Sequence, residues 1–196
     1  QKQTRANMSI MEYNGAMLVA MCGKDCVGIA SDTRLGANFL TVSTEFKKTF
    51  KIHDRLHIGL SGLGTDVQTF SALLKFRHNL YKLSEERDMK PSTFMGLVST
   101  LLYEKRFGPW FVEPVIAGLN EDGTPYIATS DLIGAVASTS DFVCTGTSTE
   151  NMYGMCESLY RPDMNPDELF ETMAQALLAS VDRDAMSGWG GQVTII

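Results

Sequence analysis

Charged and hydroxyl side chains in separate segments are the candidates for chemistry in this sequence. Asp32 and Arg34 follow an apolar stretch, and Lys48 lies sixteen residues after Asp32. Near the other end of the chain, Asp184 precedes Ser187 by three residues. Charged groups that share a cleft shift one another's pKa values, so these residues are a candidate site. Taken singly, they also have a structural interpretation, because Asp32 can pair with Arg34 and the second pair can cap a helix end.

Glycine-rich segments exclude two other kinds of chemistry. Gly62–Val67 lacks the last glycine of G-x-G-x-x-G, and no Gly-Lys-Ser or Gly-Lys-Thr follows, so neither a dinucleotide fingerprint nor a phosphate-binding loop is present. We expect Gly59–Gly64 to form a tight turn from a strand to a helix. Gly146–Glu150 ends in Glu where the hydrolase elbow G-x-S-x-G needs glycine, which favours a helix cap.

The histidines and cysteines predict no metal centre. His53 and His57 are four residues apart, but their segment has the pattern of a turn and a strand, and His78 is the only other histidine. There is also no H-E-x-x-H motif. The cysteines form no C-x-x-C pair, and we expect them to be reduced and buried: Cys22, Cys26, Cys144 and Cys156.

The composition is that of one globular domain. The chain has 196 residues, of which 44% are hydrophobic and 20% charged, and no linker or repeat divides it. Its formal net charge of −6 argues against binding to nucleic acid or to an anionic membrane surface. No apolar run is long enough to span a bilayer, and residues 1–15 contain no apolar signal core, so secretion is not expected.

Strands predominate in the first third of the chain. Two apolar stretches flank Gly23–Asp25, which predicts a hairpin, and a turn at Asp54-Arg55 precedes another strand. Thr65–Gln68 has the pattern of a capping box, so we expect a helix from there to about Glu86. A second helix begins near Pro91, where apolar residues recur with helical spacing. The expected strands are Ala16–Met21, Val27–Ala30, Phe39–Val42 and Leu56–Leu60.

Strands return before a second pair of helices. Thr147–Glu150 has the pattern of another capping box, and Asn165–Glu168 combines a cap, a proline and two acids, so a helix is expected after each. The last helix should run to about Met186. Paired helices around paired runs of strands predict an α+β fold, a four-layer αββα sandwich, rather than a doubly wound parallel sheet. The expected strands are Pro114–Leu119, Tyr126–Thr129, Leu132–Ala137, Phe142–Cys144 and Gln192–Ile196.

Six segments match a known family in the same order along the chain: Gly23–Cys26, Ser31–Gly36, Gly62–Thr69, Tyr103–Pro109, Gly154–Leu159 and Asp182–Gly190. Through them the chain resembles the β-type subunits of the eukaryotic proteasome, which are N-terminal-nucleophile hydrolases with the αββα fold. The resemblance extends from Gly15 to Ile196. Several long matches in one order make it specific.

The resemblance implies a role for each position of the candidate site. In active members of the family, an N-terminal threonine attacks the peptide carbonyl and its own freed amine acts as the base. A lysine promotes that reactivity, an aspartate orients the lysine, and a glycine amide stabilises the oxyanion. The aspartate falls on Asp32, the lysine on Lys48 and the oxyanion glycine on Gly62. The nucleophile falls on Ala16. The supporting positions fall on Thr147, Asp184 and Ser187.

Ala16 has no hydroxyl group, so the resemblance implies a non-catalytic subunit. Active members cut the chain before their threonine, and Ala16 cannot do so. We therefore expect residues 1–15 to stay attached as an unprocessed extension of a single domain, 16–196. Thr4 is no substitute nucleophile, because the N-terminal residue would lie upstream of it. The alternative, an active amidohydrolase of the same fold, is disfavoured because another residue would have to act as nucleophile.

The resemblance also implies partners and a location. The expected role is that of a structural subunit in the inner β ring of the 20S proteasome core particle, where ubiquitin-targeted proteins are degraded, in the cytoplasm and nucleus and with no cofactor. The expected partners are α-ring subunits, adjacent β subunits of types 2 and 4, and the opposite β ring. Ser130-Asp131 and Gly23–Cys26 are candidates for completing a neighbour's substrate pocket, where an acidic Asp131 would favour basic side chains. Aromatic residues expected at subunit contacts are Tyr103, Phe107, Trp110 and Phe111.

Overall fold

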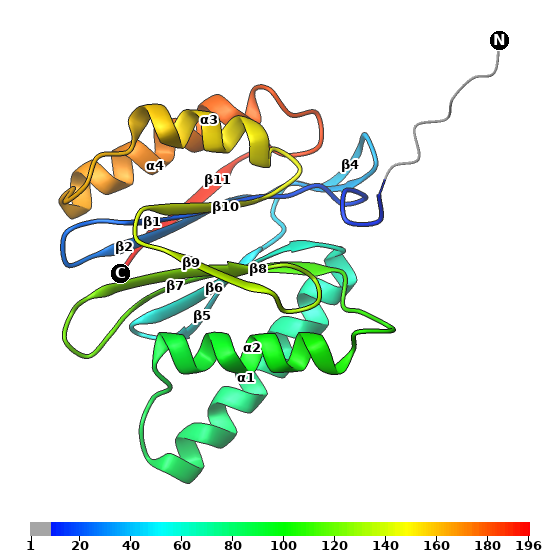
Figure 1. Ribbon diagram of the computed structural model, residues 1–196. Coiled ribbons are helices and arrows are strands. Elements are labelled where there is room, and N and C mark those ends of the chain that lie inside the picture. Colours follow the sequence, from blue (N-terminus) through cyan, green and yellow to red (C-terminus); the bar gives the residue numbers. More distant parts are fainter. Residues whose placement is uncertain (1–8) are drawn as a thin grey trace.

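Two antiparallel β-sheets pack face to face between two pairs of helices (Figure 1). The structure is a computed structural model that describes residues 9–196, so the expectations for residues 1–8, including Thr4, lie outside the described residues. The helices are α1 (Gly64–Glu85), α2 (Pro91–Glu104), α3 (Thr149–Leu159) and α4 (Pro166–Val181). The strands are β1 (Met17–Cys22), β2 (Val27–Asp32), β3 (Leu35–Ala37), β4 (Leu40–Ser43), β5 (Thr49–His53), β6 (Leu56–Gly62), β7 (Val112–Leu119), β8 (Pro125–Ser130), β9 (Val136–Thr139), β10 (Phe142–Gly146) and β11 (Gly191–Ile195).

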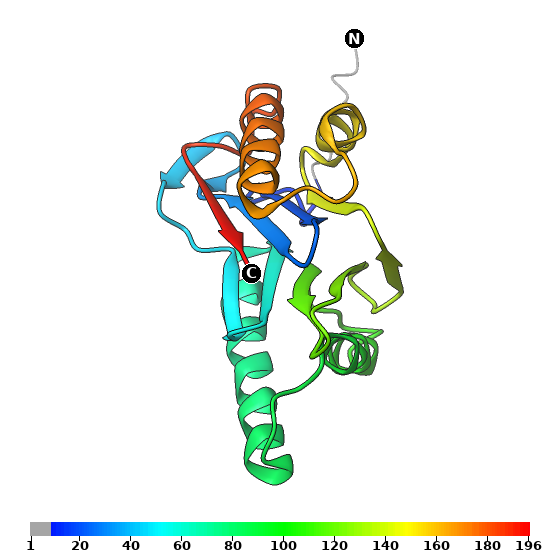
Figure 2. The same ribbon diagram turned by 90° about the vertical axis from the view of Figure 1, so that its left-hand side faces the viewer.

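The four layers confirm the expected αββα sandwich. One sheet has the strand order β10-β1-β2-β11 and is covered by α3 and α4 (Figure 1). The other has the order β5-β6-β7-β8-β9 and is covered by α1 and α2, while β3 and β4 form a separate hairpin. Figure 2 shows α1 extending past α2 and away from the sheets. The predicted β1–β2 hairpin is present, with Leu18 opposite Ser31.

Alternation along β1 divides the core between the layers. Met17, Val19 and Met21 pack toward α3 and α4, whereas Leu18 and Ala20 pack against the second sheet. Successive side chains of a strand point to opposite faces, so this one buried strand supplies two interfaces. A third apolar cluster fills the space between the second sheet and helices α1 and α2.

The predicted helix start at Asn165 is confirmed, whereas the capping box predicted near α1 is wrong. At α4, the Asn165 side chain accepts from the Glu168 amide at 2.9 Å, and the Glu168 carboxylate accepts from the Asn165 amide at 3.1 Å. At α1, the Gly64 amide donates at 2.7 Å to the side chain of Asn14 instead of to a neighbouring hydroxyl. Thr65–Gln68 is therefore no capping box, because a residue distant in sequence supplies the acceptor.

The capping box predicted before α3 is also wrong. Ser148 occupies the cap position, but its hydroxyl donates to the carbonyl oxygen of Ser180 at 3.2 Å and so links α3 to the end of α4. The Thr147 hydroxyl is used inside the candidate site. Tertiary hydrogen bonds have replaced the local pattern that Thr147–Glu150 suggested.

Other boundary differences arise where the chain leaves a regular element. α4 ends at Val181 rather than near Met186, because the following segment bends so that the Gly188 amide donates to Asp32 at 3.0 Å. The strand expected over Leu132–Ala137 is wrong in its first part, where the chain turns; β9 forms only from its end. The sequence pattern did not predict the short strands β3 and β5.

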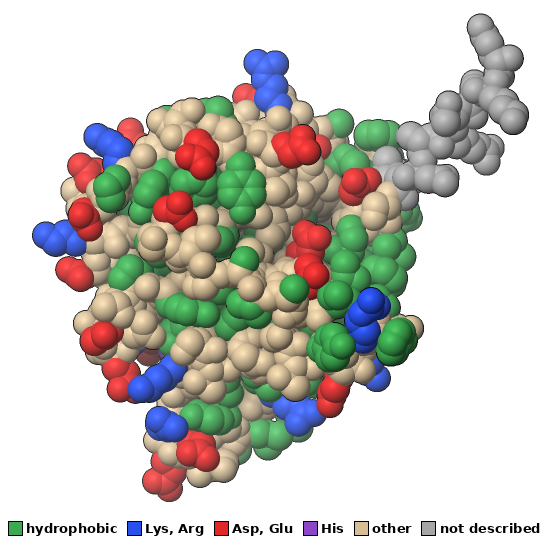
Figure 3. Space-filling model, viewed as in Figure 1, with side chains coloured by type: hydrophobic (Ala, Val, Ile, Leu, Met, Phe, Trp, Pro, Cys, Tyr) green, Lys and Arg blue, Asp and Glu red, His purple; other side chains and the backbone are tan. Residues whose placement is uncertain are grey.

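The surface retains large apolar side chains. On α1, Phe76, Leu80 and Leu83 are exposed at helical spacing, and Phe107 after α2 is 98% exposed. On the face shown in Figure 3, hydrophobic side chains lie between charged ones. No helix within residues 9–196 is long and apolar enough to cross a membrane. All four cysteines are buried and unpaired by disulfides, as expected.

Candidate functional site

Gly15 and Ala16 lie buried directly before β1, where the resemblance places the nucleophile. Ala16 is 3% exposed and presents only a methyl group. Its carbonyl oxygen accepts from both the amide and the hydroxyl of Thr147, at 2.7 and 3.1 Å. Gly15 has φ +69°, and a Cβ at Gly15 would lie 1.8 Å from the carbonyl oxygen of Met186, so only glycine fits here.

Lys48 and Asp32 form a buried ion pair beside this backbone. Their Nζ and Oδ1 atoms are 2.5 Å apart, and the side chains are 2% and 0% exposed. Lys48 also donates to the carbonyl oxygen of Gly15 at 3.1 Å. Burial lowers the pKa of Lys48, and the Asp32 carboxylate opposes that lowering. Asp32 also accepts from the amides of Met17 and Gly188, at 2.9 and 3.0 Å.

Asp184 joins the remaining members of the predicted set. Its carboxylate accepts from the hydroxyls of Thr147 and Ser187, at 2.6 and 2.7 Å, and from the Met186 amide at 3.1 Å. Thr147 links the Asp184 carboxylate to the carbonyl oxygen of Ala16, while Lys48 donates to the carbonyl oxygen of the preceding residue, Gly15. The structure therefore brings together six of the seven predicted positions around one stretch of backbone. These six are Ala16, Asp32, Lys48, Thr147, Asp184 and Ser187.

Gly62 joins the set only through a shared cavity. It ends β6 with φ +112°, and within residues 9–196 no hydrogen bond links it to Gly15 or Ala16. Gly62 and Thr147 line a cavity of about 290 Å³ together with Glu12 of the N-terminal segment. A donor that stabilises an oxyanion has to point at the carbonyl that reacts, which in cleavage of the Gly15–Ala16 bond is the carbonyl of Gly15. Here that carbonyl oxygen accepts from Lys48 instead of from the Gly62 amide.

Sequence reasoning misplaced Arg34 and missed Asn14. Arg34 reaches Asp32 only through its backbone amide, at 3.3 Å. Its buried guanidinium donates instead to the carbonyl oxygens of Met186 and Asn38 and to the Thr41 hydroxyl. Asn14 donates to the Gly36 carbonyl oxygen at 2.7 Å in addition to accepting from α1. An Asn-Gly pair directly before the first strand is the one sequence signal that marks it.

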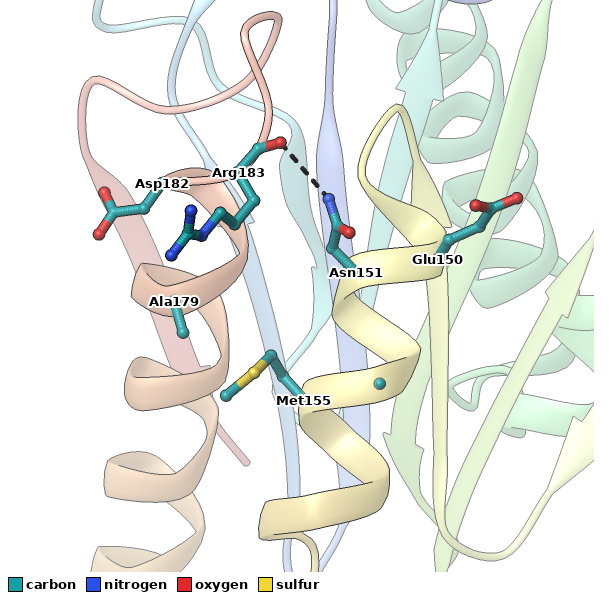
Figure 4. Close-up of a pocket in the computed structure, with 7 residues that line it drawn as sticks. Glu150, Asn151, Met155, Ala179, Asp182 and Arg183 are labelled. Carbon is teal, nitrogen blue, oxygen red and sulfur yellow. Dashed lines mark hydrogen bonds between the residues drawn. The ribbon is translucent and has the colours of Figure 1, made fainter.

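A groove lies apart from this set, between α3 and α4 (Figure 4). It has a volume of about 550 Å³ and is lined by Glu150, Met155 and Arg183, among others. The Asn151 side chain donates to the carbonyl oxygen of Arg183 across it, at 3.5 Å. None of the seven predicted site residues lines this groove, so it plays no part in the chemistry considered above.

The residues proposed for a neighbour's pocket lie only partly at the surface, because Ser130 and Cys26 are buried. Asp131 is exposed, but its carboxylate accepts from the amides of Ile133 and Ala135, at 3.1 and 2.7 Å. Burial, and then the charge of Asp131, raise the pKa of Glu113. In the other candidate turn, Lys24 and Asp25 are exposed.

The histidines lie away from the site. His53 and His78 stack with ring centroids 5.4 Å apart, and His78 Nε2 is 3.4 Å from Asp88. Within residues 9–196, no three His, Cys, Asp or Glu side chains are grouped so as to hold a metal ion.

Comparison with known proteins agrees with this geometry. Residues 12–196 match the family described as "Proteasome subunit". Relatives named "Proteasome subunit beta type-3" come from Oryza sativa subsp. japonica and Picea mariana, at 62% and 61% identity over 96% of this chain and 93% of each relative. A relative of the same name from Drosophila melanogaster is 53% identical over the same shares. These matches confirm the resemblance seen in the motifs, and the chain belongs to the proteasome subunit family.

Proposed function

We propose that this chain is a non-catalytic, structural β subunit, of type 3, in the 20S proteasome core particle. It forms part of the inner ring around the chamber in which ubiquitin-targeted proteins are degraded. The observation that carries the proposal is Ala16, which stands at the nucleophile position while the groups around it bind backbone. Residues 1–15 remain attached to the domain 16–196, and the chain works in the cytoplasm and nucleus.

The chemistry of the site supports this role. A nucleophile of this kind needs a hydroxyl and a free α-amine as its base, and Ala16 offers neither while it remains bonded to Gly15. Lys48, which would promote that reaction, donates to a backbone carbonyl and to Asp32. The same polar groups that would serve catalysis therefore hold the first strand in place.

An active amidohydrolase of the same fold is disfavoured. The neighbouring hydroxyls that could replace the missing one belong to Thr147 and Ser187. Both donate to the Asp184 carboxylate, and the single proton of the Thr147 hydroxyl is shared with the Ala16 carbonyl oxygen, 3.1 Å away. A nucleophile needs a general base within reach. Here the Asp184 carboxylate is shared by both hydroxyls, and the Ala16 carbonyl already accepts a hydrogen bond. These hydrogen bonds therefore hold the backbone in place and do not activate a nucleophile.

The exposed apolar residues support assembly into a particle. The partners are α-ring subunits, adjacent β subunits of types 2 and 4, and the opposite β ring. Phe76, Leu80 and Leu83 on α1, with Tyr103 and Phe107 after it, give the α1–α2 layer more exposed apolar surface than a monomer needs. These side chains, with the half-buried Trp110 and Phe111, are proposed to lie at subunit contacts.

Purification of the native particle tests this function. Native mass spectrometry of a tagged chain should find it in a multi-subunit particle, and crosslinks should join it to α subunits and to β subunits of types 2 and 4. A chain that remains a folded monomer at micromolar concentration, or that hydrolyses peptides by itself, contradicts the proposal.

Asp131 is proposed to contribute charge to the substrate pocket of an adjacent active subunit. Its exposure and negative charge support this role, which favours basic side chains in the substrate. Asp131→Asn keeps an oxygen acceptor for the Ile133 and Ala135 amides but removes the charge. It should lower particle cleavage after basic residues, whereas Asp122→Asn, in another exposed turn, should not. Unchanged peptidase activities in an intact Asp131→Asn particle contradict this role.

A further inference from the structure

We propose that the cavity between the β3–β4 hairpin and the segment after α4 binds an arginine side chain of a neighbouring subunit. The guanidinium group of that arginine contacts the aromatic rings of Phe39 and Trp189 and pairs with the carboxylate of Asp182. The inference rests on the proposed function in taking the chain as part of a particle.

The cavity has a volume of about 520 Å³, and its two walls come from distant parts of the chain. Phe39 and Thr41 of the hairpin line one wall, and residues 181–189 line the other. The buried Arg34 joins the walls, because its guanidinium donates to the Thr41 hydroxyl at 3.0 Å and to the Met186 carbonyl oxygen at 2.6 Å. Hydrogen bonds within the chain therefore hold the cavity in shape before any partner binds.

Trp189 is presented to solvent from a fixed and strained backbone. Its side chain is 70% exposed, and its φ of +58° lies in the left-handed region that residues other than glycine rarely adopt. The Thr33 amide donates to the Gly190 carbonyl oxygen at 3.2 Å, and the Thr33 hydroxyl donates to the Trp189 carbonyl oxygen at 3.4 Å. Phe39 on the other wall is 69% exposed. Strain that presents a tryptophan in this way indicates a binding site, because tryptophan is enriched where interfaces are most tightly bound.

The charges around the cavity select a cation. Asp182 and Asp184 line it together with a single positive group, Arg34. Arg34 is 2% exposed and its guanidinium already donates within the chain, so it offers no site for an anion. Asp184 accepts three hydrogen bonds within the chain, whereas Asp182 is exposed and has no ion pair among residues 9–196.

An arginine fits this combination of groups better than a lysine does. Its planar guanidinium stacks on aromatic rings and donates two parallel hydrogen bonds to one carboxylate, whereas an ammonium group is a compact and strongly hydrated charge. The occupant therefore uses the rings of Phe39 and Trp189 and the free carboxylate of Asp182 at the same time.

Hydroxyl-radical footprinting of the purified particle tests this assignment by mass spectrometry. The Trp189 ring should be oxidised at least about tenfold more slowly than N-acetyltryptophanamide added to the same sample. Asp182→Asn keeps the shape of the side chain and removes its charge, so Trp189 oxidation should rise about fivefold or more. Asp163→Asn serves as the control, because Asp163 is exposed in the turn before α4 and asparagine adopts its φ of +59° readily. Trp110, the other tryptophan of the chain, is the internal reference and should not change.

A second measurement identifies the occupant. Phenylglyoxal, which modifies arginine, should label one arginine of another subunit in the Asp182→Asn particle but not in the wild-type or Asp163→Asn particle. Asp182→Glu keeps the charge and should retain most of the protection of Trp189. Three results would each overturn the proposal: a Trp189 oxidised as fast as the added tryptophan derivative, equal protection in Asp182→Asn and wild type, or no newly labelled arginine. Native mass of the same sample distinguishes the two proposals, because an intact particle with an unprotected Trp189 contradicts only this inference.

Discussion

The Lys48 ammonium group donates to the carbonyl oxygen of Gly15 at 3.1 Å. The same nitrogen forms the ion pair with Asp32, so one buried cation joins the start of β1 to the end of β2. In an active relative a lysine at this position promotes catalysis, and here it stabilises backbone. A buried ion pair adds little net stability, but removal of one partner leaves an uncompensated charge.

Lys48→Met should therefore destabilise the subunit strongly. The change leaves the Asp32 carboxylate buried without its cation and the Gly15 carbonyl without its donor. We expect a loss of about 3–5 kcal/mol, measured by urea unfolding of the subunit in the purified particle. Lys47→Met changes an exposed neighbour and should cost less than about 0.5 kcal/mol. Equal losses for the two variants would show that the ion pair has no structural role.

Stability should fall on mild acidification because the histidines resist protonation. Burial lowers the pKa of His57 to about 4, with help from Lys51 and Lys47, and burial also lowers the pKa of His53 and His78. In the unfolded chain each histidine takes up a proton near pH 6.5, so the unfolded state binds more protons below that pH. Their contribution to stability is complete above about pH 6.5 and decreases as the pH falls toward the folded pKa values.

Unfolding midpoints measured from about pH 7.5 down to pH 5 check this expectation. His57→Gln should show a shallower decrease than wild type, because one titrating group is gone. Its Nδ1 atom has no partner among the described residues, so the substitution removes no hydrogen bond from that atom. Stability that rises on acidification, or an equally steep decrease in His57→Gln, contradicts this assignment.

The sequence predicts those elements whose signals are local. The start of α4 was predicted correctly because Asn165 and Glu168 cap each other within one turn. The start of α1 was predicted to within one residue, but its capping contact was not, because the acceptor is Asn14, fifty residues away in sequence. Arg34 likewise bonds to Met186, which no local pattern reveals.

The candidate site shows the same division. The resemblance named Asp32, Lys48 and Asp184, and the structure brings them to one place. The resemblance did not predict that side chains of this cluster would bind the carbonyl oxygens of Gly15 and Ala16. Backbone acceptors carry no side-chain signature, so such contacts emerge only from the fold.

Assembly should depend on the exposed aromatic residues. Phe107 is 98% exposed, and its ring contacts the guanidinium of Arg106 at the surface, so Phe107→Glu should change the fold little. A buried glutamate at a subunit contact is costly, and we expect incorporation into the particle to fall at least about tenfold. The measurement is the fraction of tagged chain that co-purifies with other subunits. Lys24→Glu serves as a control on a different surface turn. Normal incorporation of Phe107→Glu removes this residue from the contact.

Restoration of the hydroxyl should not restore an efficient enzyme. In Ala16→Thr the new side chain lies among Asp32, Lys48 and Asp184, yet the Gly15 carbonyl is bound by Lys48 and not by the Gly62 amide. Self-cleavage also needs a strained bond and a positioned water, and an oxyanion donor must lie within about 3 Å of the forming charge. We expect no processing, or activity far below that of the active subunits. Labelling by an electrophile specific for N-terminal threonine measures this, and strong labelling would show that only the nucleophile was missing.

The intact mass of this subunit from the native particle tests most directly whether the Gly15–Ala16 bond stays uncut. Ala16 has no hydroxyl with which to cut the chain, and Lys48 and Thr147 bind the backbone on either side of that bond. We expect a mass that includes Gly15 and residues upstream of it. A subunit that begins at Ala16 would show instead that the Gly15–Ala16 bond is processed as in active members of the family.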